Sequence, residues 1–277
     1  METESGLSEK IERHPITMKR VVYEIPGMDA VRIQRGIEYR TTDAGALTMD
    51  LYAQPPAATS ARMPAVVIVA GYSDVGYKAF TGCAFKDTGF CTSWAQLMAA
   101  AGLAAITYTN REPAADLRAL LHHVRQNAAP LGLDPDRIGV WASSGNVPLA
   151  LSELMQDDRD FLKCAVLCYG FTLDLEGSTA VAEAAATWKF VNPNAGKSVA
   201  DLPQNLPLFV ARAGRDEFPH LNETLDRFVA GALACNLPVT IVNHPTGPHA
   251  FDLVDDSEAS REIIRQILSF MRFHLLR

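Results

Sequence analysis

The sequence predicts an α/β fold, a mostly parallel sheet with helices on both faces. Six continuous apolar runs of strand length are distributed along the chain, which suits strands buried on both faces. Between them lie segments with apolar residues at the spacing of one helix face, and this alternation is typical of a parallel sheet covered by helices. An N-terminal segment alternates apolar and polar residues and so predicts an antiparallel hairpin.

The N-terminal part of the chain is expected to hold a leader and the hairpin. Residues 1–20 are mostly polar and mixed in charge, without the apolar core of a signal peptide, and we expect a loosely ordered leader there. From Val31 to Tyr52, two alternating segments flank the turn residues 42–45. This hairpin should lead directly into the parallel sheet.

The buried strands and the helices between them follow in order. The six apolar runs are Ala65–Ala70, Ala104–Tyr108, Ile138–Ala142, Ala165–Tyr169, Leu208–Ala211 and Val239–Val242. Apolar residues recur at helical spacing within residues 117–124, 221–229 and 264–271.

Two connections are longer than strand packing requires. Residues 72–94 follow the first apolar run and are rich in glycine, threonine and aromatic residues. Residues 170–207 follow Tyr169 and include an expected helix over residues 179–190. Long connections in a compact domain usually carry function or cover a site, and open α/β sheets bind ligands at the carboxyl edge where both would lie.

Length and composition limit the classes of function. The 277 residues, 48% of them hydrophobic, suit one large α/β domain over residues 1–277. A net charge of −7 argues against nucleic acid or an anionic membrane surface as a partner. No apolar run is long enough for a membrane span. The five scattered cysteines suit reduced thiols in a cytoplasmic protein, although Cys83 and Cys91 could approach one another.

The most informative stretch is residues 137–151, where an apolar strand meets a corner of small residues and then the start of a helix. A serine at such a corner is held out of the sheet beside helix N–H groups and the helix dipole. Ser143 and Ser144 both lie there. A simpler interpretation is a Ser-Ser-Gly turn that caps an ordinary helix.

This stretch resembles the nucleophile elbow of the α/β-hydrolase family, G-x-S-x-G. The matching residues are Ala142-Ser143-Ser144-Gly145-Asn146, so both outer glycines are replaced. The family commonly has R-I-G-x-W-G-x-S-x-G, which places the nucleophile at Ser144. Choosing Ser143 would recover Gly145 as the last glycine but would put Trp141 at the most crowded position. The resemblance covers residue 30 to the end and is strongest to esterases and dienelactone-hydrolase-related members. It implies the α/β-hydrolase fold with a small lid over residues 171–207.

A serine nucleophile needs a base, and the base needs an orienting acid. The family has them in the order Ser, Asp, His after successive strands. Here Asp216 follows the strand at Leu208–Ala211, and His249 follows the strand at Val239–Val242 in a Gly-x-His-x-Phe setting. The resemblance therefore implies Asp216 as the acid and His249 as the base.

Alternatives exist for both residues. Glu217 adjoins Asp216, and His244 lies within the strand before His249. Three further histidines, His122, His123 and His220, lie on expected helices and are given no catalytic role.

The resemblance also implies an oxyanion hole with two N–H donors. Gly145, the residue after the nucleophile, should supply one of them. The loop after the first buried strand should supply the other, and we expect Tyr72, with Gly71 giving the chain freedom to turn. A simpler role for Gly71 is to turn the chain.

The activity implied by the resemblance is hydrolysis of a small carboxylic ester, with short acyl chains favoured. A cysteine is the nucleophile of dienelactone hydrolases proper, so the serine argues against that substrate. An acyltransferase, a peptidase or an inert binding scaffold are the alternatives. No zinc-ligand spacing and no phosphate-binding glycine motif occurs in the sequence, so no cofactor or metal is expected. The expected partner is a small-molecule ester, and the sequence is compatible with a homo-oligomer.

Overall fold

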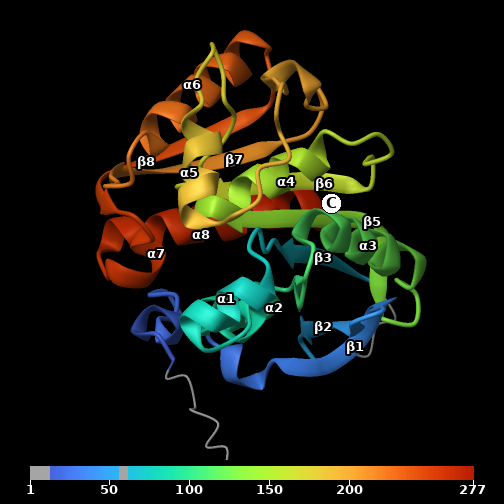
Figure 1. The fold of residues 1–277 in the computed structure, drawn as a ribbon. Coiled ribbons are helices and arrows are strands. Elements are labelled where there is room, and N and C mark those ends of the chain that lie inside the picture. The colour runs from blue at the N-terminus through green and yellow to red at the C-terminus, as the bar shows by residue number, and fades with distance from the viewer. Residues whose placement is uncertain (1–12, 56–61) are drawn as a thin grey trace, which may run out of the picture.

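The computed structural model describes residues 13–55 and 62–277, and the described chain forms one eight-stranded sheet (Figure 1). The strands are β1 Arg32–Thr42, β2 Gly45–Ala53, β3 Met63–Ile68, β4 Ala104–Tyr108, β5 Leu133–Ser143, β6 Leu162–Cys168, β7 Leu208–Arg215 and β8 Val239–Pro248. Their order in the sheet is β1-β2-β4-β3-β5-β6-β7-β8. β1 and β2 pair antiparallel, as does β2 with β4, and every other pairing is parallel. The predicted hairpin and six core strands are confirmed.

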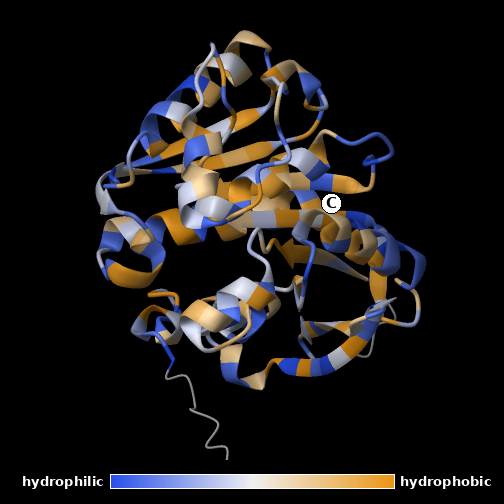
Figure 2. Cartoon of the chain, in the orientation of Figure 1, coloured by the Kyte–Doolittle hydropathy of each residue, from blue (hydrophilic) through white to orange (hydrophobic). Residues whose placement is uncertain are grey.

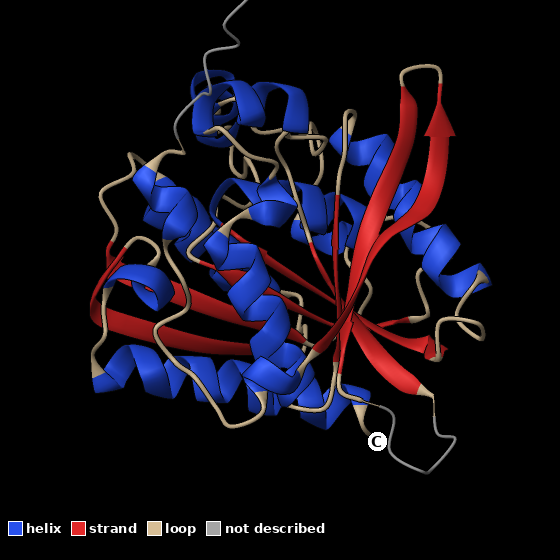
Figure 3. Ribbon diagram, turned by 90° about the horizontal axis from the view of Figure 1, so that it is seen from below, coloured by secondary structure: helices blue, strands red, loops and turns tan. Residues whose placement is uncertain are grey.

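Helices cover both faces of the twisted sheet (Figure 3). They are α1 Asp74–Thr81, α2 Gly89–Ala100, α3 Pro113–Gln126, α4 Val147–Leu154, α5 Ala180–Trp188, α6 Leu221–Ala234, α7 Phe251–Val254 and α8 Glu258–Leu275. Trp94 of α2 packs on Trp141 of β5 with ring centroids 4.9 Å apart, and Leu275 of α8 packs over Gly139. Gly139 and Trp141 are two residues apart on one strand, so α2 and α8 share a face of the sheet.

The central strands are apolar on both faces, and the hydrophobic core follows them (Figure 2). All five residues of β4 are buried, and β3 is buried except for its first residue. Burial on both faces explains why these strands have continuous apolar runs, whereas β1 alternates and is mostly exposed. None of the helices in the described ranges has both the length and the apolar character needed to span a bilayer.

The long connection expected over residues 72–94 is largely helical. It holds α1 and the first part of α2, with a short 3-10 turn at Phe85–Asp87 between them. Gly82, in the left-handed conformation, ends α1, and Thr88 begins α2 by accepting the Cys91 N–H at 3.2 Å. The glycine and threonine residues that indicated a loop are therefore helix ends as well as helix residues.

Two other predictions concern the N-terminal leader and the pair Cys83 and Cys91. Of the leader expected over residues 1–20, residues 1–12 lie outside the described ranges. Residues 13–20 include a 3-10 turn at Pro15–Met18, and the His14 N–H donates to the Thr81 carbonyl at 3.0 Å. Cys83 and Cys91 are both free, and burial raises the pKa of the Cys91 thiol.

The parallel strands end at one edge of the sheet, and that edge holds the predicted site. The residues that directly follow β5, β7 and β8 are Ser144, Asp216 and His249. The loop after β3 contains Gly71 and Tyr72. The topology alone thus gathers the residues selected from the sequence.

Candidate active site

The corner after β5 has the backbone of a strained strand-to-helix turn. Ser144 has φ 55°, a left-handed conformation that is uncommon for a residue with a side chain. It begins a 3-10 turn, Ser144–Asn146, that leads into α4. Ser143 instead has extended backbone at the end of β5, and it is buried. Of the two serines, Ser144 is therefore the one that projects from the corner.

Ser144, His249 and Asp216 form one chain of hydrogen bonds. His249 Nε2 lies 2.9 Å from Ser144 Oγ, and His249 Nδ1 lies 2.6 Å from Asp216 Oδ2. The Phe218 N–H donates to the other carboxylate oxygen of Asp216 at 3.0 Å. The Asp216 side chain is fully buried, whereas 20% of the His249 side chain is exposed. In this arrangement the acid fixes Nδ1 as the protonated nitrogen and leaves Nε2 free to accept the serine proton.

The competing residues lie elsewhere. Glu217 is exposed. His244 is buried, and its Nε2 contacts Asp255 and Ser260 instead of Ser144. His122 and His123 lie on α3, and His220 contacts Glu223 at the start of α6.

The loop after β3 lies against the corner because of Asn146. The Gly71 N–H donates to Asn146 Oδ1 at 2.7 Å, and Asn146 Nδ2 donates to the Ser143 carbonyl at 2.9 Å. A Cβ on Gly71 would stand 2.8 Å from the Gly145 carbonyl oxygen, so only glycine allows this approach. Asn146 thus has a defined role where the resembled family has glycine. Because the Gly71 N–H is already bonded to Asn146, it cannot act as the expected oxyanion donor of this loop. Tyr72, the next residue, remains the expected donor.

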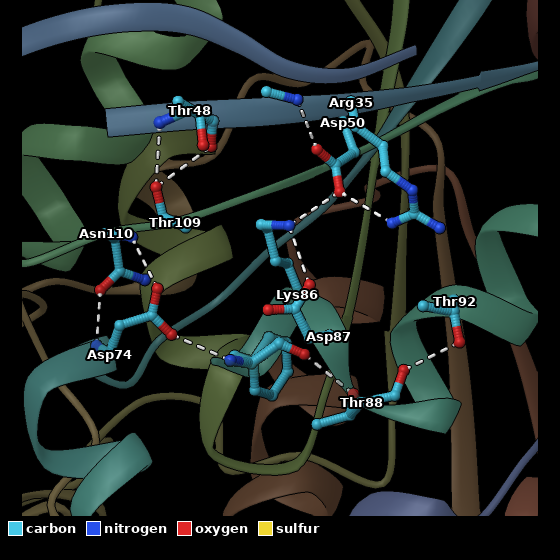
Figure 4. A network of polar contacts seen from close by, with 12 residues as sticks. Arg35, Thr48, Asp50, Asp74, Lys86, Asp87, Thr88, Thr92, Thr109 and Asn110 are labelled. Carbon is cyan, nitrogen blue, oxygen red and sulfur yellow. Dashed lines mark hydrogen bonds and ion pairs between the residues drawn. The ribbon is translucent and has the colours of Figure 1, made fainter. Parts of the chain in front are cut away.

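A second set of polar contacts holds the same loop from the side of β4. Asn110 Nδ2 donates to the Ala70 carbonyl at 3.3 Å, and the Tyr108 hydroxyl accepts the Ala70 N–H at 3.1 Å. Asp74 and Asn110 exchange two further hydrogen bonds, as Figure 4 shows. Burial raises the pKa of Asp74. These contacts fix the backbone on both sides of Gly71 and Tyr72.

The remainder of Figure 4 shows how this region is joined to the hairpin. Asp50 of β2 accepts from Lys86 at 2.8 Å and from the Gly36 N–H at 2.9 Å, and Arg35 lies 3.5 Å away. Asp50 is buried, so these donors offset the loss of its hydration. The network secures the segment between α1 and α2 to β2.

A buried carboxyl group that the sequence did not indicate lies behind His249. Asp252 accepts from the Tyr169 hydroxyl at 2.5 Å and from Trp94 Nε1 at 2.7 Å. The Tyr169 ring meets the His249 ring edge-on, with centroids 5.1 Å apart. Burial raises the pKa of Asp252. The hydrogen bond to Asp252 thus fixes the Tyr169 ring, which packs against the imidazole of His249.

Aromatic rings surround the corner on the side of residues 171–207. Phe190 stacks on Phe171 with centroids 5.4 Å apart and meets Tyr72 edge-on at 6.2 Å. Phe218 lies 4.5 Å from the His249 ring, and half-exposed Trp188 packs on Phe218. The Val191 N–H donates to the Gly71 carbonyl at 2.9 Å. The segment expected as a lid, which holds α5, is therefore bonded to the loop after β3.

With this geometry described, solved structures provide a comparison. MGS-M1, an α/β hydrolase from a Medee basin deep-sea metagenome library, superposes with a TM-score of 0.64 at 18% identity, over 90% of this chain and 99% of that chain. A thermophilic esterase of Thermogutta terrifontis gives 0.65 at 18%, over 90% and 94%. Vibralactone cyclase gives 0.67 at 16%, over 91% and 82%.

The chain has the α/β-hydrolase fold. No protein-family profile matches it, and no curated protein sequence does either. Within this fold, the ends of β5, β7 and β8 are followed directly by Ser144, Asp216 and His249. At these identities the comparison establishes the fold and leaves the activity to the site.

Proposed function

We propose that the protein is a serine hydrolase that cleaves small carboxylic esters. The observation that supports this most is the continuous hydrogen-bond chain from Ser144 through His249 to buried Asp216, built on a strained corner. The left-handed backbone at Ser144 costs free energy of folding, and strain of this kind is found mostly at functional sites. The activity needs no cofactor.

The reaction would proceed through an acyl-enzyme. His249 Nε2 takes the proton of Ser144 as its Oγ bonds to the ester carbonyl carbon, and the carbonyl oxygen becomes an oxyanion. Gly145 and Tyr72 would donate hydrogen bonds to that oxygen. Collapse of the intermediate breaks the bond to the alkoxy oxygen, which leaves with the proton from His249. Water then loses a proton to His249 and attacks the acyl carbon. The bond from that carbon to Ser144 Oγ breaks as His249 returns the proton to Oγ, which releases the acid and restores both residues.

Short acyl groups are favoured by the rings at the corner. A Cβ on Gly145 would stand 2.6 Å from Phe190 Cδ1 and 2.4 Å from the Tyr72 hydroxyl oxygen. Both rings therefore pack directly on the residue after the nucleophile and leave little room for a long chain. The Thermogutta terrifontis esterase has been solved with propionate and with butyrate bound, which is consistent with short acyl groups on this fold.

The neighbours compared above are named as a hydrolase, an esterase and a cyclase. None of the three is named as a dienelactone hydrolase, so we propose carboxylic esters in general as substrates and not dienelactones. An acyltransferase or peptidase would use the same three residues with a different acceptor. Products formed in the presence of competing alcohols, amines and peptides distinguish them.

The experiment is hydrolysis of p-nitrophenyl esters from acetate to decanoate by the wild type and Ser144→Ala. We expect turnover that falls with chain length and is lost in the variant. No turnover on any ester, together with no reaction on amides or added acyl acceptors, would contradict the proposal and leave a binding scaffold.

A further inference from the structure

The phenol of Tyr72 stands at the corner, and its hydroxyl has no hydrogen-bond partner among residues 13–55 and 62–277. A Cβ on Gly145 would lie 2.4 Å from its hydroxyl oxygen, so this oxygen is placed directly against the Cα of Gly145. Burial is what raises the pKa of Tyr72 to about 12, and no hydrogen bond or charge from another described residue contributes to the shift. The hydroxyl is thus neutral at physiological pH and available as a donor.

The ring is held so that the hydroxyl stays at this place. Tyr72 packs against Phe190, Tyr77 and Phe85, with ring centroids 6.2, 5.9 and 6.5 Å away. Gly71, the preceding residue, is fixed by Asn146. A donor fixed by surrounding packing stabilises a developing charge without reorganising at the moment of reaction.

The hydroxyl and the backbone N–H of Tyr72 cannot both serve one oxyanion. Two ordinary hydrogen bonds to a shared oxygen span less than about 6 Å. A tyrosine hydroxyl lies farther than that from its own backbone nitrogen. The contribution of Tyr72 therefore comes from one of the two groups, and the hydroxyl lies directly against Gly145, whose N–H is the other expected donor.

We propose that the phenolic hydroxyl of Tyr72, in place of its backbone N–H, donates to the substrate oxyanion together with the Gly145 N–H. This inference rests on the proposed ester hydrolysis. It makes Tyr72 a catalytic residue whose side chain touches the reacting oxygen.

Tyr72→Phe tests the assignment because it removes only the hydroxyl and keeps both the ring and the backbone N–H. We expect kcat on p-nitrophenyl acetate to fall by about 100-fold, in the range found when one oxyanion donor is removed. KM should change less than threefold, since the bond strengthens as charge develops on the oxygen. Tyr52→Phe, the same change in a buried ring of β2 away from the corner, should leave kcat within twofold.

A second measurement separates this role from packing. A trifluoromethyl ketone forms a charged hemiketal with the serine, and its affinity for Tyr72→Phe should fall in parallel with kcat/KM. Thermal melting should show the variant folded. Unchanged kcat and ketone affinity in a folded Tyr72→Phe would overturn the inference and return the role to the backbone N–H. If the wild type neither hydrolyses esters nor reacts with a fluorophosphonate, the proposed function fails as well, so the two failures are distinguishable.

Discussion

The protein contains two clusters of one serine, one histidine and one aspartate, and the hydrogen bonds within the two clusters are arranged differently. One is Ser144, His249 and Asp216. The other is Ser260, His244 and Asp255, whose histidine lies five positions earlier, within β8. Both groups have histidine contacts to a carboxylate and a hydroxyl between 2.6 and 3.1 Å. Residue types and distances alone therefore do not distinguish them.

The difference lies in which nitrogen each partner meets. In the first group Asp216 meets Nδ1 and Ser144 meets Nε2, so the ring joins the carboxylate to the serine hydroxyl. In the second group, Asp255 and Ser260 both converge on Nε2, and Nδ1 is buried without a partner in the described chain. When both partners contact the same nitrogen, the histidine cannot be oriented through one ring nitrogen while it accepts a proton on the other.

Exposure and backbone separate the groups further. Ser144 is partly exposed on a strained corner, whereas Ser260 is fully buried in α8. Ser260 also donates to Asp255 at 2.8 Å, and His244 is only 1% exposed. The second group fastens the start of α8 to β8, which is a structural role.

The largest contrast is expected when the two serines are truncated. Ser144→Ala should lower kcat by about 10⁶-fold, because the nucleophile is lost. Ser260→Ala should leave kcat within a few fold and lower the melting temperature, since it loses buried hydrogen bonds. Ester turnover and thermal melting of both variants measure this. Comparable loss of activity in the folded Ser260→Ala variant would remove the distinction.

The two aspartates should differ next. Asp216→Asn should lower kcat by about 10⁴-fold, because an amide no longer selects the tautomer with a free Nε2. Asp255→Asn should keep kcat within twofold. Steady-state kinetics with p-nitrophenyl acetate test both, and an active Asp216→Asn enzyme would show that the acid lies elsewhere.

The corner of the first group should weaken without Asn146. Asn146→Gly restores the glycine of the resembled pattern but removes the 2.7 Å bond that holds Gly71. We expect kcat to fall about tenfold with little change in KM, since an oxyanion donor loses its positioning. Asn127→Gly, at the end of α3, is the control, because it makes the same change away from the site and should leave kcat unchanged. Higher kcat in Asn146→Gly would contradict this role.

The smallest expected effect concerns stability at the second group. Burial opposes ionisation of Asp255, but hydrogen bonds from Ser257 and Ser260 and the contact with His244 outweigh it and lower the pKa of Asp255. A lowered folded-state pKa adds stability above the unfolded value near 3.9, and that stability is lost as pH falls through the folded value. Asp255→Asn should therefore cost about 1 kcal/mol near pH 7 and less below pH 4. Urea unfolding at both pH values measures the difference, and a pH-independent loss would count against it.

The sequence predicted features that follow from local pattern. Continuous apolar runs located the core strands. The resemblance to the α/β-hydrolase pattern selected Ser144, Asp216 and His249 in the segments that follow three of those strands, and parallel strands end at one edge of the sheet. It did not predict contacts between distant segments. The Asn146–Gly71 bond joins residues 75 positions apart, and the Trp94–Asp252 bond joins residues 158 apart. The spacing of apolar residues along the chain carries no information about hydrogen bonds between residues so far apart.

Some missed features left a weak signal. Asn146 stood out as a departure from glycine, yet only the structure shows the bond its side chain makes. The helix α1 has few apolar residues at helical spacing, so its sequence indicated a loop. The rings of Trp188 and Phe218 come together only when residues 171–207 fold back on the sheet edge.

The most direct test of the account is to label the folded protein with a fluorophosphonate and map the adduct by peptide mass spectrometry. Ser144, activated by His249, should carry the only adduct, and Ser144→Ala should be unlabelled while Ser143→Ala and Ser260→Ala are labelled like the wild type. An adduct on Ser143 or Ser260, or a folded wild type that remains unlabelled, would contradict the assignment of Ser144 as the nucleophile.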